Sequence, residues 1–192
     1  MSINAPKATI LDNNRTRIGI IGSGFIASGL RMAVDNQPDM QVSRMLTRRN
    51  LADLPAGELF TNSVDDLIDH SELVVEAAGD PIYGTDVVAR ILEAGLPVVT
   101  MDAELQITTG TYLSTLGYLT EAEGDQPGAL AALHREALAM GFKPLVYGNL
   151  KGFLNLNPTP HDMDYWAKFQ GISLDQVTAF TDGTKLQVEQ VL

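Results

Sequence analysis

The sequence predicts an α/β fold, built on a doubly wound and mostly parallel sheet. Short runs rich in Val, Ile and Leu alternate along the chain with amphipathic segments of helical period, which is the pattern of consecutive βαβ units. Hydrophobic residues make up 45% of the 192 residues, and aromatic residues only 6%. This composition is typical of a parallel sheet covered by helices on both faces.

The first elements of the predicted sheet lie before residue 70. Residues 17–21 are a β-rich run that ends in glycines, as expected of a buried first strand. Residues 25–36 carry small and apolar residues at helical spacing, and residues 40–46 alternate in polarity like a second strand. A helix is predicted to start at Ser63, because Asp66 follows the capping hydroxyl by three residues.

The alternation continues in the middle of the chain. Residues 73–77 predict a third strand, and residues 83–94 predict an amphipathic helix that Gly95 ends. The Thr- and Gly-rich stretch after residue 100 gives no clear prediction. The other elements expected here are strand 97–100, strand 118–122, helix 127–140 and strand 144–147.

The pattern changes beyond residue 148. Thr159 is followed by Pro at the first helical position and by Asp162, which predicts a capped helix that Gly171 ends. A strand is expected at 177–180 and a helix at 184–192. The last helix has no stop signal, so the chain is expected to be truncated within a second domain.

Composition excludes several classes of function. The formal net charge of −11 argues against a nucleic-acid partner, and no apolar stretch is long enough to span a membrane. The absence of cysteine excludes thiolate nucleophiles and thiolate metal sites. Glu123 and Asp125 could bind a divalent ion, but no third ligand is visible beside them, and Asp125 also fits a helix cap. A polar amino terminus without a signal peptide predicts a cytoplasmic protein with a flexible arm over residues 1–14. Arginines nevertheless concentrate before residue 51, which indicates a local anion site.

A glycine motif follows the first strand and opens the first helix. Gly22 permits a tight turn, Gly24 lets the backbone approach a pyrophosphate, and Ala27 lets the helix pack closely on the strand. The diphosphate of a dinucleotide would then lie on the free amides of the helix amino terminus. This context predicts a Rossmann domain, with cofactor contacts from Gly22, Ser23, Gly24, Phe25 and Ile26.

The end of the second strand predicts which dinucleotide is bound. Domains specific for NAD place an acid there, about 20 residues past the glycines, to bind the ribose hydroxyls. This chain has instead Thr47, Arg48 and Arg49, and guanidinium groups suit a 2′-phosphate. We therefore expect NADP(H) as the cofactor, with NAD(H) as the alternative. If the segment has only a structural role, it is a solvated basic turn.

The end of the third strand is also expected to border the cofactor. In an open α/β sheet, ligands bind at the carboxyl ends of the strands. Ala77, Ala78 and Gly79 are small enough there for the backbone to lie beside the nicotinamide ribose. Asp80 and Pro81 fit a ligand contact or an ordinary turn equally well.

These motifs resemble a known family. The runs Gly-Ser-Gly-Phe-Ile-Ala27, Val-Val-Glu-Ala-Ala-Gly79 and Pro-Val-Val-Thr100 resemble the nucleotide-binding domain of homoserine dehydrogenase. Glu-Gly-Asp-Gln-Pro127, Gly-Phe-Lys-Pro144, Gly-Asn-Leu-Lys-Gly152 and Thr-Asp-Gly-Thr-Lys185 resemble homoserine-dehydrogenase-like oxidoreductases that carry a SAF domain. One branch of that family is similar to deoxyxylulose-phosphate reductoisomerases. Homoserine dehydrogenases usually have Asn-Lys after Thr100, where this chain has Met-Asp-Ala-Glu104, so the resemblance does not identify homoserine as the substrate.

The late motifs supply the catalytic candidates, Lys151, Asp182 and Lys185. A lysine near the nicotinamide could polarise a carbonyl oxygen or hold an anionic substrate group. The structural interpretation of Lys185 is a surface ion pair with Glu189, four residues later. His134 falls on an apolar helical stripe, which favours a packing role for it.

The sequence thus predicts an NADP-dependent oxidoreductase that moves a hydride between nicotinamide and the carbonyl or hydroxyl carbon of a small polar metabolite. A dinucleotide-binding domain is expected over residues 15–150, and the start of a substrate domain over 151–192. The full-length form is expected to be a homo-oligomer. The alternative is a non-catalytic NAD(P)-binding module or a truncated remnant.

Overall fold

A computed structural model describes residues 14–54, 59–123, 126–146, 155, 157–171 and 173–181. The chain divides into two compact units, residues 1–121 and 122–192. The sequence analysis expected the first domain to end at residue 150 and therefore to include helix α5 (Gln126–Ala139). In the structure, α5 belongs to the second unit. Among the described residues, no helix is both long and apolar enough to cross a membrane.

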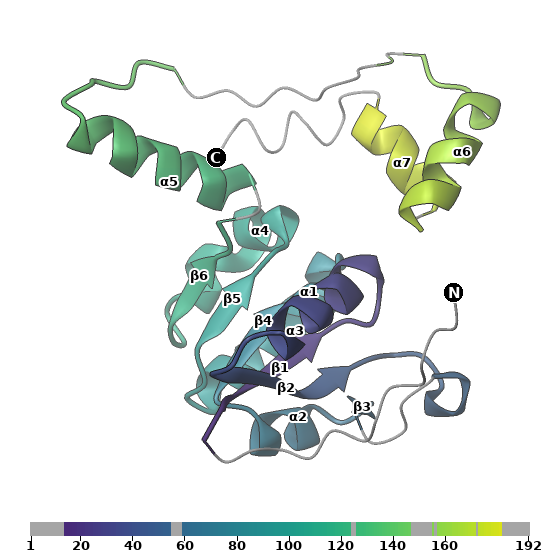
Figure 1. Cartoon of the computed structure of the whole chain (residues 1–192), viewed down its shortest axis with the longest axis vertical. Coiled ribbons are helices and arrows are strands. Elements are labelled where there is room, and N and C mark those ends of the chain that lie inside the picture. Colours follow the sequence, from purple (N-terminus) through teal and green to yellow (C-terminus); the bar gives the residue numbers. More distant parts are fainter. Residues whose placement is uncertain are drawn as a thin grey trace. The chain divides into compact units, whose positions relative to one another are not determined.

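A six-stranded sheet in the order β3-β2-β1-β4-β5-β6 forms the centre of the first unit (Figure 1). All of its pairings are parallel, which confirms the predicted doubly wound α/β fold. The order reverses beside β1, and the carboxyl ends of β1, β2 and β4 meet at this switch point, where such sheets bind ligands. The strands are β1 (Thr16–Ile21), β2 (Met40–Leu46), β3 (Phe60–Thr61), β4 (Leu73–Glu76), β5 (Val98–Thr100) and β6 (Leu119–Glu121).

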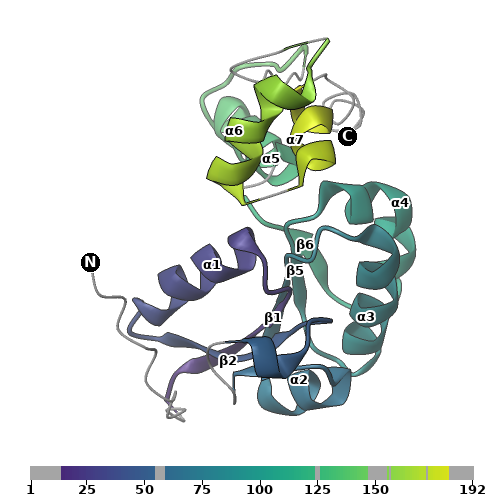
Figure 2. The ribbon, with the colours of Figure 1, turned by 90° about the vertical axis from the view of Figure 1, so that its right-hand side faces the viewer.

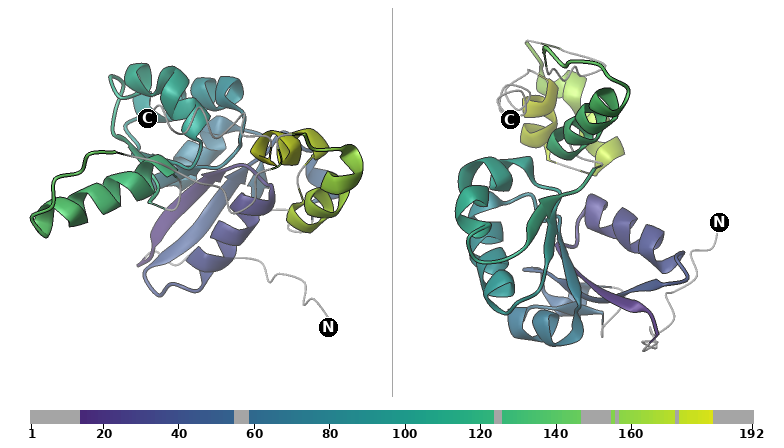
Figure 3. Two further views of the ribbon diagram at one scale, coloured as in Figure 1. Left: turned by 90° about the horizontal axis from the view of Figure 1, so that it is seen from above. Right: turned by 90° about the vertical axis from the view of Figure 1, so that its left-hand side faces the viewer.

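Helices cover both faces of this sheet. Helix α1 lies on one face, and α2, α3 and α4 lie on the other (Figures 2 and 3). Each face has its own apolar core: Ala27 and Val34 of α1 pack with one buried cluster, whereas Leu67, Ile91 and Leu105 belong to the other. The helices are α1 (Phe25–Asp35), α2 (Val64–His70), α3 (Pro81–Glu93) and α4 (Ala103–Leu113), with a short 3₁₀ turn at Leu51–Asp53.

The predicted helix caps of the first unit are present. The Ser63 side chain accepts a hydrogen bond from the Asp66 amide, 3.3 Å away. Helix α4 was not predicted, since its Ile, Thr and Gly residues have low helix propensity. Asp102 caps α4, and Leu105 and Leu113 are fully buried beneath it, so tertiary packing stabilises this helix.

The second unit contains helices α5, α6 (Pro160–Gln170) and α7 (Leu174–Thr181). Thr159 and Asp162 form the predicted capping box, and Gly171 ends α6 with a φ of 67°. The predicted strand at 177–180 is wrong, because these residues belong to α7. The predicted strand at 144–147 is also wrong for residues 144–146, which form neither helix nor strand. Residue 147 and the predicted helix at 184–192 lie outside the described residues.

Candidate functional site

The turn between β1 and α1 requires glycine at position 22. Gly22 has a φ of 120°, a conformation that side chains strongly disfavour. A Cβ atom at this position would lie 2.7 Å from the carbonyl oxygen of Ala77. The Gly22 amide also donates to the Leu46 carbonyl oxygen, at 2.8 Å. The turn is therefore fixed against the carboxyl ends of both neighbouring strands, β2 and β4.

Gly24 has a different role in the same turn. Gly24 is the N-cap residue of α1, and because glycine has no side chain it makes no capping hydrogen bond. Its φ of −84° is open to any residue. A Cβ atom here would meet no other atom within 4 Å. The fold thus tolerates a side chain at Gly24, and the absence of one keeps space open in front of the helix. The first amides of α1 have no intrahelical partner, and they form a ready site for an anion.

The segment after β2 is held in place by hydrogen bonds. The Ser23 and Thr47 hydroxyl oxygens lie 2.8 Å apart, which joins the glycine turn to the end of β2. The Thr47 hydroxyl oxygen also accepts from the Arg49 amide at 3.2 Å. Asn62 donates to the carbonyl oxygen of Arg49 at 3.1 Å. These contacts fix the backbone and leave the Arg48 and Arg49 side chains exposed at the edge of the sheet.

Arg48 reaches across this edge to the start of α3. One of its guanidinium nitrogens lies 2.8 Å from Asp80 Oδ2, and its central carbon lies 4.4 Å from the centre of the Tyr83 ring. Asp80 is also the N-cap of α3, where Oδ1 accepts from the Tyr83 amide at 3.1 Å. The amide of Tyr83 foremost, and then Arg48, lower the pKa of Asp80, so Asp80 remains a carboxylate at neutral pH.

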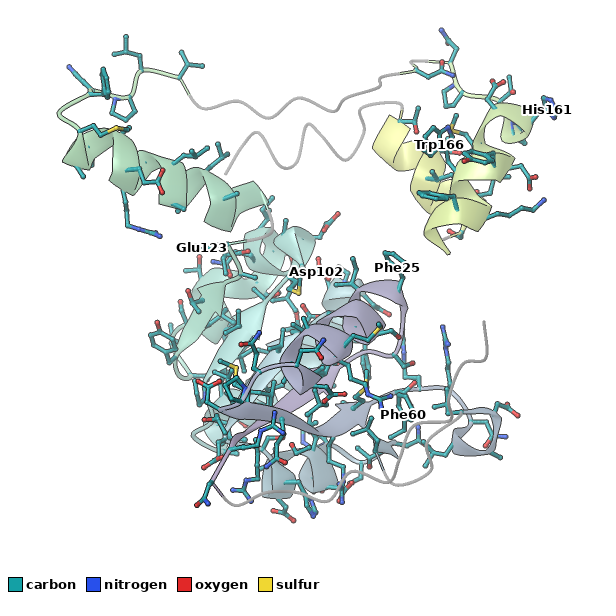
Figure 4. All side chains as sticks on the ribbon, in the orientation of Figure 1. Phe25, Phe60, Asp102, Glu123, His161 and Trp166 are labelled. Atoms are coloured by element: carbon teal, nitrogen blue, oxygen red, sulfur yellow. The ribbon has the colours of Figure 1, made fainter. Side chains whose placement is uncertain are left out.

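These groups surround one cavity of about 370 Å³ at the switch point of the sheet. Phe25, Ile26, Ala77 and Gly79 are absent from its lining, although each adjoins a lining residue or the first turn of α1. Figure 4 shows Phe25 at the start of α1, at the same end of the first unit as Asp102. The cavity is lined by Gly22, Ser23, Gly24, Leu46, Thr47, Arg48, Arg49, Ala78 and Tyr83.

The sequence reasoning missed two residues of this site and left a third, Asp80, open between a ligand contact and an ordinary turn. Leu46 and Tyr83 line the cavity, and Asp80 holds Arg48. The only signal for Asp80 and Tyr83 was their place just after a strand at the carboxyl edge, a place they share with many structural residues. The catalytic candidates Lys151, Asp182 and Lys185 lie outside the described residues.

A buried network ties the carboxyl ends of β4 and β5 together beside the cavity. Glu76 is fully buried; its Oε1 accepts from the Ala78 amide at 2.7 Å, and its Oε2 accepts from the Thr100 hydroxyl at 2.8 Å. The Thr100 hydroxyl oxygen in turn accepts from the Asp102 amide at 3.0 Å. Glu76 thus fixes the backbone of Ala78, which borders the cavity.

Asp102 is a buried acid at this edge whose pKa is raised. Its side chain is 5% exposed, and Oδ1 accepts from the amides of Glu104 and Leu105 at the start of α4. Burial foremost, then a hydrogen bond with the Glu104 side chain and repulsion from Glu76 and Glu104, raise the pKa of Asp102 to about 7. The buried Oδ2 has no hydrogen-bond donor in the described part of the chain.

Comparison with known families identifies the first unit. The model of the homoserine dehydrogenase NAD-binding domain matches residues 22–126, more than half of the chain. The chain belongs to this family. A second model, the catalytic domain of oxidoreductase DRL, matches residues 124–192, close to the second compact unit. Both descriptions name oxidoreductases, which confirms the predicted resemblance to homoserine dehydrogenase, and the NAD-binding domain indicates a nicotinamide cofactor.

Solved structures resemble parts of this chain at low sequence identity. A meso-dapdh mutant with DAP from Clostridium tetani is 17% identical over 66% of this chain and 42% of its own, with a TM-score of 0.54. An engineered D-amino acid dehydrogenase bound to NADP+ is 18% identical over 66% and 41%, with a TM-score of 0.53. Homoserine dehydrogenase of S. aureus is 18% identical over 56% and 33%, with a TM-score of 0.45. The chain thus spans less than half the length of these proteins. A search of curated proteins gave no match.

Proposed function

We propose that this chain is the cofactor-binding part of an NADP(H)-preferring oxidoreductase, which moves a hydride between nicotinamide and the carbonyl or hydroxyl carbon of a small polar metabolite. The observation that carries the proposal is the cavity at the switch point. Its lining combines a glycine turn at a helix amino terminus with the guanidinium groups of Arg48 and Arg49, and no acid lies among residues 47–52, which follow β2.

The residues of the cavity fit the two anionic parts of this cofactor. The open space in front of Gly24 suits a pyrophosphate, which the first amides of α1 would bind. Arg48, Arg49 and the Thr47 hydroxyl would bind the 2′-phosphate, since guanidinium groups offer paired donors to phosphate oxygens. When bound, the nicotinamide supplies the hydride chemistry, and the protein supplies orientation and electrostatic stabilisation.

Substitutions of Arg48 and Arg49 test the proposed preference for NADP(H). We expect Arg48→Ala or Arg49→Ala to weaken NADPH binding about ten- to hundredfold, because a hydrogen bond to a charged group contributes roughly 1.5–3 kcal/mol. NADH binding should change little, since NADH lacks the phosphate. Fluorescence titrations of both cofactors on the wild type and each variant measure this.

A matched control and two outcomes decide that experiment. Arg90→Ala also removes an exposed, ion-paired arginine, which contacts Asp65 at 2.7 Å and does not line the cavity, so it should leave both affinities unchanged. Equal losses for NADPH and NADH in the Arg48 and Arg49 variants would mean that these residues support the fold. A wild type that binds NADH more tightly than NADPH would overturn the proposed preference.

Lys151, Asp182 and Lys185 are proposed as catalytic residues, and the catalytic-domain match over residues 124–192 supports a catalytic role for this segment. In a panel of small hydroxy and carbonyl metabolites, Lys185→Ala should lower kcat about tenfold, the equivalent of one hydrogen bond to a developing charge. NADPH affinity should stay unchanged.

Two variants serve as comparisons for Lys185→Ala. Lys168→Ala removes a lysine that pairs with Asp164 at 2.6 Å on the surface of α6, and His134→Ala removes a half-buried residue of α5. A greater loss of rate in His134→Ala without unfolding would contradict the assignment of Lys185. If no metabolite is turned over while NADPH binds, the non-catalytic alternative stands.

Membership of the SAF-domain branch, similarity to sugar-phosphate reductoisomerases, assembly into a homo-oligomer and a cytoplasmic location are part of this proposal. Their support is the resemblance of the late sequence motifs to that family. The expected partner is a small-molecule substrate, because the net charge of −11 disfavours nucleic acid.

A further inference from the structure

The two arginines of the cavity differ in their surroundings. The Arg48 guanidinium is paired with Asp80 Oδ2 at 2.8 Å and stacked over the Tyr83 ring at 4.4 Å. The Arg49 side chain lines the same cavity and has no ion-pair partner within the described ranges. Arg49 therefore offers a cation that is open to an anion, whereas the charge of Arg48 is already balanced.

We propose that Asp80 competes with the 2′-phosphate for Arg48 and thereby sets how strongly the site prefers NADP(H) over NAD(H). This inference rests on the proposed function, because it concerns the same cavity. Asp80, the N-cap residue of α3, would act as a specificity-determining residue through its contact with Arg48.

Charge explains why Asp80 would affect one cofactor and not the other. Asp80 and Arg48 together are neutral, so a phosphate that approaches Arg48 must either displace the carboxylate or lie beside it. A phosphate dianion near a carboxylate is repelled, whereas a ribose hydroxyl is not. Both side chains are partly exposed, at 61% for Arg48 and 32% for Asp80, so solvent screens the effect and limits it to a modest factor.

The second role of Asp80 allows its charge to be tested alone. Asp80 caps α3 through Oδ1, and asparagine caps helices as well as aspartate does. Asp80→Asn therefore keeps the cap and removes the charge that holds Arg48. A structural role restricted to capping would leave the cofactor preference of this variant unchanged.

The experiment measures NADPH and NADH affinities of the wild type and Asp80→Asn at low salt. We expect NADPH to bind about two- to fivefold more tightly to Asp80→Asn, with NADH unchanged, as one screened ion pair allows. In an Arg48→Ala background the same substitution should have a smaller effect on NADPH, because the competition has been removed. Asp65→Asn is the control: it removes an exposed acid that pairs with Arg90, outside the cavity.

The outcomes separate this inference from the proposed function. If the wild type binds neither dinucleotide, the proposed function and the inference both fail. If the wild type binds NADPH and NADH but Asp80→Asn leaves their ratio unchanged, only the inference fails. A loss of NADH affinity in Asp80→Asn would overturn it as well, because Asp80 would then hold the ribose hydroxyls. An equal gain of NADPH affinity in Asp65→Asn would contradict the inference too, because the effect would then come from the net charge of the protein.

Discussion

Replacing Gly24 with valine is expected to weaken NADPH binding by more than about a hundredfold, through loss of two or more charged hydrogen bonds between the pyrophosphate and the amides of α1. The valine side chain would occupy the space in front of α1, where a Cβ atom meets no protein atom within 4 Å. Because the φ of −84° at Gly24 suits any residue, the free energy of unfolding should fall by only about 1 kcal/mol, the cost of a poorer N-cap residue. NADPH fluorescence titration and urea unfolding measure the two quantities.

Two other glycines of the same region serve as controls for Gly24→Val. Gly29→Val adds the same side chain on α1, where a Cβ atom also meets nothing within 4 Å, and it should leave NADPH binding intact. Gly22→Ala should instead destabilise the fold, because a Cβ there would lie 2.7 Å from the Ala77 carbonyl oxygen. Unchanged NADPH binding in a folded Gly24→Val variant would remove the basis for the cofactor site.

The second large effect is a pH dependence of the free energy of unfolding, caused by Asp102. An unfolded aspartate has its ordinary pKa of 3.8, whereas burial raises the pKa of Asp102 to about 7 in the folded protein. Between these values the folded state keeps a proton that the unfolded state has lost, so this carboxyl lowers the stability of the wild type as pH rises from about 4 to about 7. Above pH 7 the effect is constant.

Asp102→Asn removes this ionisation and retains an oxygen that can cap α4. Relative to the wild type, the variant should gain stability between pH 4 and pH 7, by about 4 kcal/mol at most, since one pKa unit corresponds to about 1.4 kcal/mol. Urea unfolding of both proteins at pH 4.5, 6 and 8 measures the difference. Asp53→Asn, in the exposed 3₁₀ turn, is the control. A difference between wild type and Asp102→Asn that does not vary with pH would contradict the raised pKa of Asp102.

Local signals predicted most elements of the first unit. The residues of β4 and β5 are short runs rich in valine, β1 runs into the Gly22 turn, and β2 alternates in polarity. Ser63 and Gly95 predicted helix ends by their residue type alone. A hydroxyl caps amides nearby in sequence, and a glycine adopts the positive φ of 87° seen at Gly95. Such signals depend on the nearest residues alone.

The secondary-structure predictions that were missing or wrong share a physical cause, which is tertiary packing. Helix α4 contains Thr108, Thr109 and Gly110, which favour other conformations, yet it forms because its apolar side chains are buried against the sheet. Residues 144–146 resemble a strand but have no strand to pair with in the part of the chain that the structure describes. Leu145 and Val146 are 81% and 87% exposed there. Val177 is buried on α7, where helical packing overrides its preference for strands.

By itself, the sequence determined the doubly wound sheet, the glycine turn and the basic segment after β2, because these depend on local backbone geometry and on short-range order along the chain. Only the tertiary structure decided that Asp80 and Tyr83 face Arg48, and that Glu76, Thr100 and Asp102 form one buried network. These contacts join residues from different strands and helices. Their distances and their burial exist only once the sheet has brought its carboxyl edge together.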